Sequence, residues 1–301
     1  LMVGAIRDCL PDSDKPIMAY VSPHAPEIGA LLTRNGVPAF AAAESCTAAL
    51  DAMFKVGQFV APVDAPPVGA AMAFESATGS LDEAQAKQLF AQFGVPCAAE
   101  RIVSTPAEAE AAAHALGGRV VLKILSSTIT HKSDVGGVAV GLTADTVGAR
   151  LTRMKSDVQG HTGVAPERFL VQEMVGGGTE LILGMHRDAL GTAVLLGMGG
   201  VTAELFKDTT LRLLPQDEHG LRGLCRAEAL AMAKDLKTWP LLDGFRGRPK
   251  ADVDALVDAI VAFSGMAAQL GERLVEAEIN PVFVRAQGEG VSAADGVVVL
   301  A

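Results

Sequence analysis

A histidine, a lysine, a carboxylate and a glycine pair lie close together in residues 129–138, between two apolar segments. The apolar segment before them, residues 120–125, is typical of a buried strand. A strand, a polar glycine loop and a second strand can bring the backbone close to phosphates, because glycine lets successive N–H groups point inward. Gly136 and Gly137 are the candidates for this role, and His131 adds an imidazole that can act as a nucleophile near neutral pH. The alternative for His131 is a loop histidine that only caps a strand.

Lys123 lies inside the apolar strand that precedes this loop. Burying an ammonium group costs free energy unless an anion compensates it, so we expect Lys123 to reach the phosphates of a nucleotide. The alternative is a lysine on an edge strand, with its stem buried and its charge in water.

Two further places carry groups that suit a nucleotide and a metal ion. Glu173 and Glu180 bracket the glycine run 176–178, and a turn there can bring both carboxylates to one side of a cleft, where a carboxylate can accept hydrogen bonds from a vicinal diol. The alternative is a pair of solvated hairpin charges. Asn280 follows one predicted strand and Asp295 comes just before the next, and both offer the hard oxygen atoms that Mg²⁺ prefers.

The segment Thr130–Val138, with the sequence THKSDVGGV, resembles the signature of the ADP-forming acyl-CoA synthetases, which are relatives of succinyl-CoA synthetase. This resemblance implies an α/β chain with an ATP-grasp fold, in which a small α/β lobe is followed by an antiparallel-sheet lobe. It also implies that His131 is transiently phosphorylated and that Lys123, Gly136 and Gly137 contact the nucleotide phosphates.

The resemblance extends to the other motifs and implies roles for their residues. It places the adenine hinge at Glu173 to Val175, with the ribose near Glu180. It makes Asn280 and Asp295 the Mg²⁺ ligands. A final stretch, Gly197-Met198-Gly199-Gly200 followed by Glu204, Lys207, Asp208 and Arg212, is similar to a phosphoryl-facing wall of the family, with Arg212 as a phosphate contact.

Three regions are expected along the chain. Residues 1–60 read as a βαβα unit, with helices at 26–35 and 42–56, and are similar to the end of a flavodoxin-like, doubly wound CoA-ligase domain. Residues 61–80 read as a linker, and residues 81–301 as the ATP-grasp domain. Within that domain we expect helices at 80–93 (capped by Ser80 with Glu83), 106–116, 144–158, 218–234 and 250–270, and strands at 169–175, 180–185, 193–198, 274–279 and 297–300.

Composition excludes several classes of function. The net charge of −10 argues against nucleic acid or an anionic membrane as a partner. The four cysteines form no C-x-x-C pair, which favours reduced thiols in a cytoplasm and disfavours a zinc site. The sequence shows neither a signal peptide nor an apolar run of the ~18 residues that a membrane span needs.

The resemblance implies the reaction acyl-CoA + ADP + Pi ⇌ carboxylic acid + ATP + CoA, with ATP or ADP and Mg²⁺ bound by this chain. CoA and the acid would bind to upstream domains outside the chain, which reads as a fragment of a longer protein. One alternative is a non-catalytic, ligand-sensing domain of a protein lysine acetyltransferase, and another is a carboxylate–amine ligase that does not need His131. The sequence leaves open the identity of the acid, the choice between ADP and GDP, the formation of a homo-oligomer, and whether the chain is a fragment or a subunit.

Overall fold

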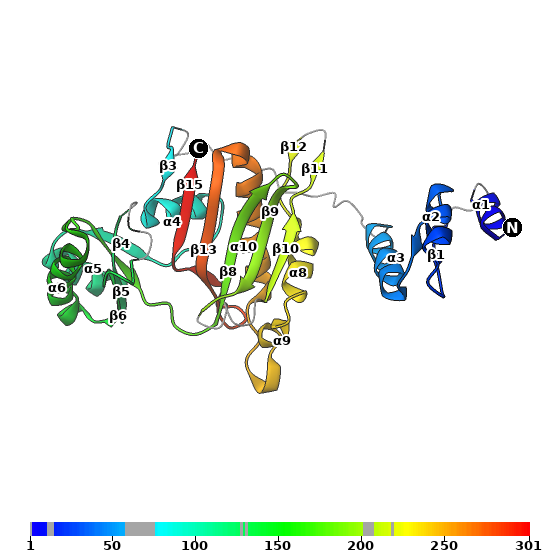
Figure 1. Cartoon of the computed structure of the whole chain (residues 1–301). Coiled ribbons are helices and arrows are strands. Elements are labelled where there is room, and N and C mark those ends of the chain that lie inside the picture. Colours follow the sequence, from blue (N-terminus) through cyan, green and yellow to red (C-terminus); the bar gives the residue numbers. More distant parts are fainter. Residues whose placement is uncertain are drawn as a thin grey trace. The chain divides into compact units, whose positions relative to one another are not determined.

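The computed structural model describes residues 2–10, 15–57, 76–126, 129, 132–200, 208–217 and 220–301. The chain divides into two compact units, Leu1–Val63 and Asp64–Ala301, and each is described by itself (Figure 1). Most of the linker predicted at residues 61–80 lies outside the described residues.

The first unit has a short helix, Met2–Asp8, and then the predicted βαβα order. The two short strands pair in parallel, with Ala19 opposite Ala39 and Tyr20 opposite Phe40. That this unit is the end of a flavodoxin-like domain stays a prediction. Its elements are α1 (Met2–Asp8), β1 (Ala19–Tyr20), α2 (Pro26–Arg34), β2 (Ala39–Phe40) and α3 (Ala43–Gly57).

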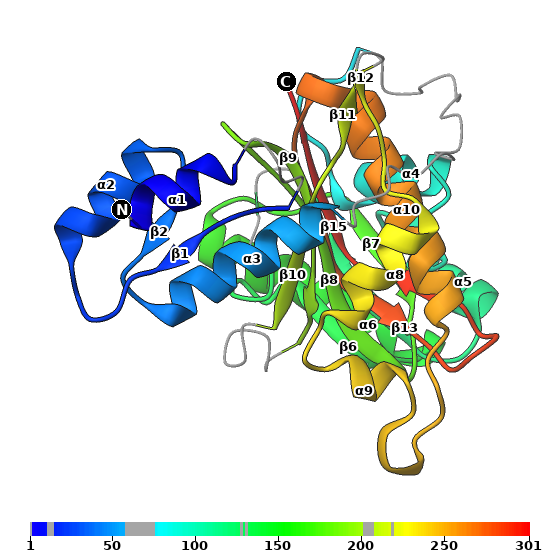
Figure 2. The ribbon, with the colours of Figure 1, turned by 90° about the vertical axis from the view of Figure 1, so that its right-hand side faces the viewer.

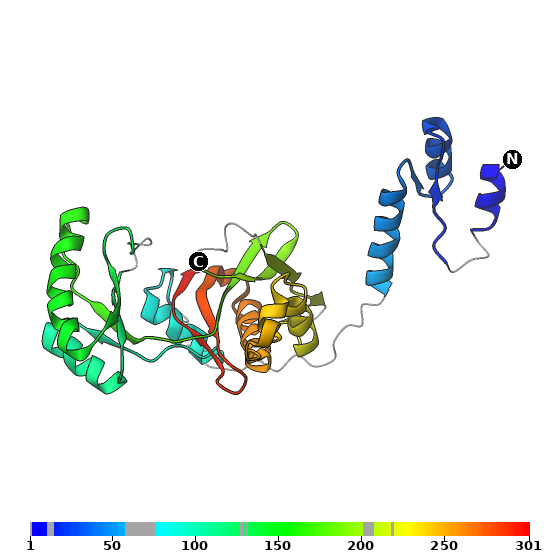
Figure 3. The same ribbon diagram turned by 90° about the horizontal axis from the view of Figure 1, so that it is seen from below.

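The second unit contains a small lobe built on a four-stranded antiparallel sheet of order β4-β7-β5-β6. Two helices cover one face of this sheet (Figure 3), and the apolar side chains of alternate strand positions pack beneath them. The other face carries the polar side chains of Lys123 and Gln172 together with the apolar Val121 and Leu170. The elements are β4 (Glu100–Val103), α5 (Pro106–Leu116), β5 (Val120–Ile124), β6 (Val138–Leu142), α6 (Ala144–Thr162) and β7 (Phe169–Glu173).

The large lobe holds an antiparallel sheet of order β10-β9-β8-β13-β15-β3, with β14 paired to β13. Helices α8 and α10 lie side by side on one face of this sheet (Figures 1 and 2). The elements are β3 (Gly79–Ser80), α4 (Glu83–Gln92), β8 (Thr179–Asp188), β9 (Gly191–Met198), β10 (Thr209–Leu213), β11 (Gln216–Asp217), β12 (Gly220–Leu221), α8 (Arg226–Lys234), α9 (Trp239–Leu242), η1 (Phe245–Gly247), α10 (Val253–Leu270), η2 (Gly271–Arg273), β13 (Leu274–Val284), β14 (Val291–Ala293) and β15 (Gly296–Leu300).

Strand pairing decides which side chains share a face of the large sheet. Leu183 of β8 lies opposite Leu196 of β9 and Ile279 of β13, and all three are fully buried in the core. Neighbouring positions in a strand point to opposite faces, so Glu180 and Asn280 lie on the face without helices. This helix-free face is the one available to a ligand.

Helix α10 is long and apolar enough to cross a bilayer by composition alone. Ten of its residues are buried, and its apolar face packs with the strands in the main core. Its role as a core helix accounts for its composition, so it is weak evidence for a membrane span.

Two predicted helix starts are wrong. The helix expected from Glu218 begins at Arg226, with Cys225 as its N-cap, and the preceding segments Gln216–Asp217 and Gly220–Leu221 form the strand pair β11–β12 instead. The helix expected to be capped by Ser80 is capped by Asp82, which forms a capping box with Gln85.

Candidate active site

Lys123 is a buried lysine in an interior strand of the small sheet. Strand β5 lies between β7 and β6, and only 6 % of Lys123 is exposed. Its ammonium group donates hydrogen bonds to Glu83 Oε1 at 2.7 Å, to the carbonyl of Ala294 at 2.8 Å and to Asp295 Oδ2 at 3.3 Å. The edge-strand alternative is therefore wrong, and protein carboxylates supply the compensating negative charge.

Glu83, the first residue of α4, is a carboxylate on which three lysines converge. Its Oε1 accepts hydrogen bonds from Lys87 at 2.8 Å and Lys123 at 2.7 Å, and its Oε2 accepts one from Lys132 at 2.5 Å. Burial alone would raise the pKa of Glu83, but the three ammonium groups outweigh burial and hold that pKa well below its usual range. Glu83 is therefore ionised and is the shared counter-charge of the three lysines.

Lys87 connects this carboxylate to the small sheet. Its ammonium group donates to Gln172 Oε1 at 2.6 Å and forms an ion pair with Glu100. Burial alone would lower the pKa of Lys87, but Glu83 and Glu100 raise it above its ordinary value. Helix α4 packs on β15 of the large lobe, so these contacts join the two lobes. We name the whole group the ion cluster: Glu83, Lys87, Glu100, Lys123, Lys132 and Asp295.

From the sequence, Glu83 was expected only as the partner of a helix cap, and Lys87 was not singled out. One signal could have identified both. Glu83 and Lys87 are four residues apart and lie on the same helical face as the core residues Ala86 and Phe90. Opposite charges four residues apart, on the helix face that also carries the apolar core residues, indicate a buried ion pair.

The glycine loop forms a compact turn after β5. Gly137 N–H donates to the carbonyl of Lys132 at 2.8 Å, and Gly136 N–H donates to that of Ser133 at 3.1 Å. A Cβ at Gly137 would lie 2.7 Å from Ile124 Cδ1, so the close approach requires glycine. Both N–H groups are occupied within the turn, which differs from the expectation that they face phosphates. In this structure the two glycines shape the loop that places Lys132.

The predicted metal ligands lie next to each other where β13 and β15 meet. The backbone N–H of Asn280 donates to the carbonyl of Asp295 at 3.2 Å. Asn280 Nδ2 donates to Glu278 Oε1 at 3.2 Å, and Asp295 Oδ1 accepts the N–H of Gly296 at 2.8 Å. An amide oxygen and two carboxylates are all hard donors, so these residues fit a Mg²⁺ ion.

The predicted hinge is the segment that leads from β7 of the small lobe to β8 of the large lobe. The backbone N–H groups of Glu173 and Met174 donate to the carbonyls of Ala99 and Arg119, and Glu173 Oε1 accepts the N–H of Ala99 at 2.8 Å. Among the hydrogen bonds of the described residues, none uses the backbone of Val175. Val175 can therefore offer its N–H and C=O groups to a base.

Glu180 lies exposed at the start of β8, beside the turn that follows β9. The carbonyl of Glu180 accepts the N–H of Gly199 at 2.8 Å, and a Cβ at Gly200 would lie 3.0 Å from Glu180 Oε2. These residues line a pocket of about 360 Å³ with Gly178, Thr179, Met198, Leu241 and Arg248. A carboxylate in an open pocket beside the hinge suits a diol.

Arg212 does not lie with the other predicted site residues. It is opposite Val194 in the sheet register, which places it on the helix-covered face, and it forms an ion pair with Asp235 after α8. Asp208 also has a structural role, because it accepts the N–H groups of Lys237 and Thr238 at 2.8 Å. We therefore leave Arg212 out of the site.

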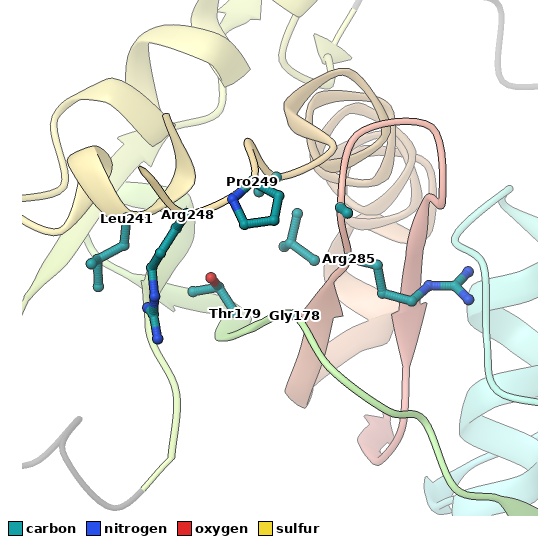
Figure 4. Close-up of a pocket in the computed structure, with 9 residues that line it drawn as sticks. Gly178, Thr179, Leu241, Arg248, Pro249 and Arg285 are labelled. Atoms are coloured by element: carbon teal, nitrogen blue, oxygen red, sulfur yellow. The ribbon is translucent and has the colours of Figure 1, made fainter. Parts of the chain in front are cut away.

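Three predicted positions, His131, Glu204 and Lys207, lie outside the described residues. A second pocket, of about 230 Å³, lies between the start of β8 and the segment after η1. Figure 4 shows Arg248 and Arg285 extending in different directions from this pocket, with the guanidinium of Arg285 pointing away from it. The two cations therefore do not form a shared anion site.

The arrangement of two lobes joined by a hinge agrees with a family match. The ATP-grasp domain family matches residues 72–300. This match covers the whole of the two-lobed unit that the structure describes.

Several curated relatives are similar to the same part of the chain. Acetate–CoA ligase [ADP-forming] I of Archaeoglobus fulgidus is 35 % identical over 215 residues, which cover 71 % of this chain and 30 % of that protein. The β subunit of acetate–CoA ligase [ADP-forming] II of Pyrococcus furiosus is 31 % identical over 232 residues, which cover 73 % of this chain and 92 % of the subunit. The chain thus matches less than a third of the longer relative.

Solved structures give the same result. The dinucleotide-forming acetyl-coenzyme A synthetase 1 of Ca. Korarchaeum cryptofilum, in complex with coenzyme A, Ca-AMPCP and HgCl⁺, has a TM-score of 0.67 at 35 % identity. That match covers 76 % of this chain and 96 % of the other. A second complex, with Mg-AMPPCP and a phosphohistidine segment pointing towards the nucleotide site, has a TM-score of 0.61 at 33 % identity, covering 74 % and 93 %. The chain belongs to the ADP-forming acyl-CoA synthetase family.

Proposed function

We propose that this chain is the nucleotide-binding part of an ADP-forming acid–CoA ligase. The observation that carries the proposal is the meeting of Lys123, a buried cation, with Asp295 and Asn280, two hard oxygen ligands, at the junction of the lobes. A polyphosphate with its metal ion needs both kinds of group. Val175 and Glu180 would hold the base and the ribose at the hinge.

Each residue has one task in this proposal. Lys123 attracts the phosphates, and Asn280 and Asp295, supported by Glu278, would hold Mg²⁺, which neutralises phosphate charge when bound. The ion cluster keeps the lobes together around the phosphates. Water is kept from Lys123 by its burial, which strengthens its attraction to anions.

The phosphoryl group would reach ADP through His131. An imidazole nitrogen attacks the phosphorus of an acyl phosphate, the bond from phosphorus to the acyl oxygen breaks, and the carboxylate leaves. A terminal oxygen of ADP then attacks the same phosphorus, the P–N bond breaks, and ATP forms. The acyl phosphate and free CoA come from acyl-CoA and inorganic phosphate on domains outside this chain, so the full reaction is acyl-CoA + ADP + Pi ⇌ acid + ATP + CoA.

The relatives support the ligase over the alternatives. They are ligases by name, and one related structure contains a phosphohistidine segment. A sensing domain of an acetyltransferase finds no support in them. A carboxylate–amine ligase would leave His131 without a function.

Binding and transfer can be tested separately with two variants. Lys123→Met should weaken Mg-ADP binding by about tenfold to a hundredfold, because one charge-assisted contact is lost. His131→Ala should bind Mg-ADP like the wild type but, in the full-length enzyme, should lose acyl-CoA-dependent ATP formation and alkali-stable phosphate on the protein. Calorimetry measures the first effect, and turnover with phosphate labelling measures the second.

Arg212→Met is the matched control, because Arg212 is a cation on the other face of the sheet and should leave binding unchanged. Absence of Mg-ADP binding by the wild type would contradict the proposal. Normal turnover by His131→Ala would mean that phosphate reaches ADP by another route.

A further inference from the structure

Four charged side chains of the ion cluster form an alternating ring. Lys123 lies 2.7 Å from Glu83 Oε1 and 3.3 Å from Asp295 Oδ2. Lys132 lies 2.5 Å from Glu83 Oε2 and 4.0 Å from Asp295 Oδ1. Each lysine therefore bridges both carboxylates, and each carboxylate uses one oxygen atom for each lysine.

The ring is closed on one side and open on the other. The side chain of Glu83 is 0 % exposed and those of Lys123 and Lys132 are 7 % and 12 % exposed, whereas that of Asp295 is 33 % exposed. Asp295 is thus the most exposed of the four side chains, and the ring opens toward its side. Glu83 lies behind both lysines and has no access to the ligand.

We propose that Glu83 is a positioning residue that holds Lys123 and Lys132 side by side at Asp295, so that both ammonium groups face the phosphates of a bound nucleotide. This inference rests on the proposed nucleotide site. If Asp295 were to hold a metal ion, Glu83 would be the anion that still pairs with both lysines. Lys132 thereby becomes a second phosphate-facing cation, although the glycine loop rather than a strand carries it.

The alternative is that Glu83 is only a structural ion partner between α4 and the small sheet, as its contact with Lys87 would suggest by itself. A structural role predicts equal losses for every ligand. A positioning role predicts a loss only for ligands with phosphates.

The test compares ADP with adenosine, in the presence of Mg²⁺, by calorimetry on the full chain. Glu83→Gln keeps the shape but not the charge, and its amide group cannot accept hydrogen bonds from both lysines through separate oxygen atoms. We expect Glu83→Gln and Lys132→Met each to weaken ADP binding by about tenfold and to change adenosine affinity by less than about twofold. Glu228→Gln is the matched control, because Glu228 lies in the first turn of α8 and pairs with Arg222 outside the cluster.

A double-mutant cycle tests whether Glu83 acts through Lys132. In Glu83→Gln the ammonium group of Lys132 is no longer held in place. Adding Lys132→Met to this variant should therefore weaken ADP binding by less than about a further threefold. A second tenfold loss would show independent action and overturn the proposal, as would equal losses of ADP and adenosine.

Two controls keep the outcomes distinct. If Glu83→Gln does not fold, Glu83→Asp replaces it, and a selective loss of ADP affinity is again required. If the wild type binds neither ligand, the nucleotide site itself is wrong. If the wild type binds ADP and the variants bind it equally well, only the role of Glu83 is wrong.

Discussion

The phosphate end and the hinge end of the candidate site differ in how their charges are satisfied. At the phosphate end, Glu83, Lys123 and Asp295 neutralise one another in a largely buried network. At the hinge end, Glu180 is exposed, and backbone hydrogen bonds fix its position. The difference teaches that the lysines at one end are already paired with carboxylates of the chain, whereas Glu180 at the other end is open to solvent.

This difference has an energetic consequence. Three lysines face three carboxylates in the ion cluster, so its formal charges balance. Removal of one member leaves an unbalanced charge in a largely buried network, which costs far more than a single ion pair contributes. Removal of Glu180 leaves no such charge, because water replaces its contacts. Mutations in the ion cluster should therefore lower the free energy of unfolding, whereas mutation of Glu180 should affect nucleotide affinity and leave the free energy of unfolding nearly unchanged.

The largest expected effect on stability is that of Lys87→Met. It leaves Glu100 without its cation and removes one of three from Glu83, so the free energy of unfolding of the two-lobed unit should fall by about 3–5 kcal/mol. Glu180→Gln should change it by less than about 0.5 kcal/mol. Trp239 is the only tryptophan of the chain, so its fluorescence during urea unfolding reports on this unit alone. If the two variants lowered the free energy of unfolding equally, the two ends of the candidate site would not differ in how they contribute to stability.

A smaller effect should appear in acid. The pKa of Glu83 is lower in the folded chain than in the unfolded chain, where it is about 4.3. Its contribution is therefore fully present above that pH and is lost as the pH falls through the folded pKa. The difference in unfolding free energy between wild type and Glu83→Gln should shrink as the pH falls below about 4. A difference that stays constant down to about pH 3 would show that the charge of Glu83 does not stabilise the fold.

The sequence was sufficient for features that depend on a local pattern. The lysine in an apolar run predicted a buried cation, and the Asn280 and Asp295 motifs predicted two neighbouring oxygen ligands. The structure places Lys123 3.3 Å from Asp295, although the two residues are 172 positions apart in the chain. Neither pattern indicated that Glu83 would lie between the two lobes.

Other features depend on register and on non-local packing, which the sequence does not show. Arg212 was expected to face the phosphates, but its pairing with Val194 turns it to the helix-covered face. Gly136 and Gly137 were expected to offer their N–H groups, but the turn uses them itself. The role of His131 stays a prediction, because it lies outside the described residues.

The smallest expected effect is that of Glu180→Gln on nucleotide affinity. A carboxylate accepts hydrogen bonds from two ribose hydroxyls, whereas an amide offers one acceptor oxygen. Because Glu180 is exposed, water competes for these bonds, and the loss should be about fivefold to tenfold. Glu276→Gln, an exposed glutamate on β13, is the matched control. The decisive measurement repeats the titration with 2′,3′-dideoxy-ADP, which lacks both hydroxyls. The wild type should bind it at least as weakly as Glu180→Gln binds ADP, and the variant should distinguish the two ligands less than the wild type does. If the variant still prefers ADP by the wild-type ratio, the ribose lies elsewhere and the hinge end has been assigned incorrectly.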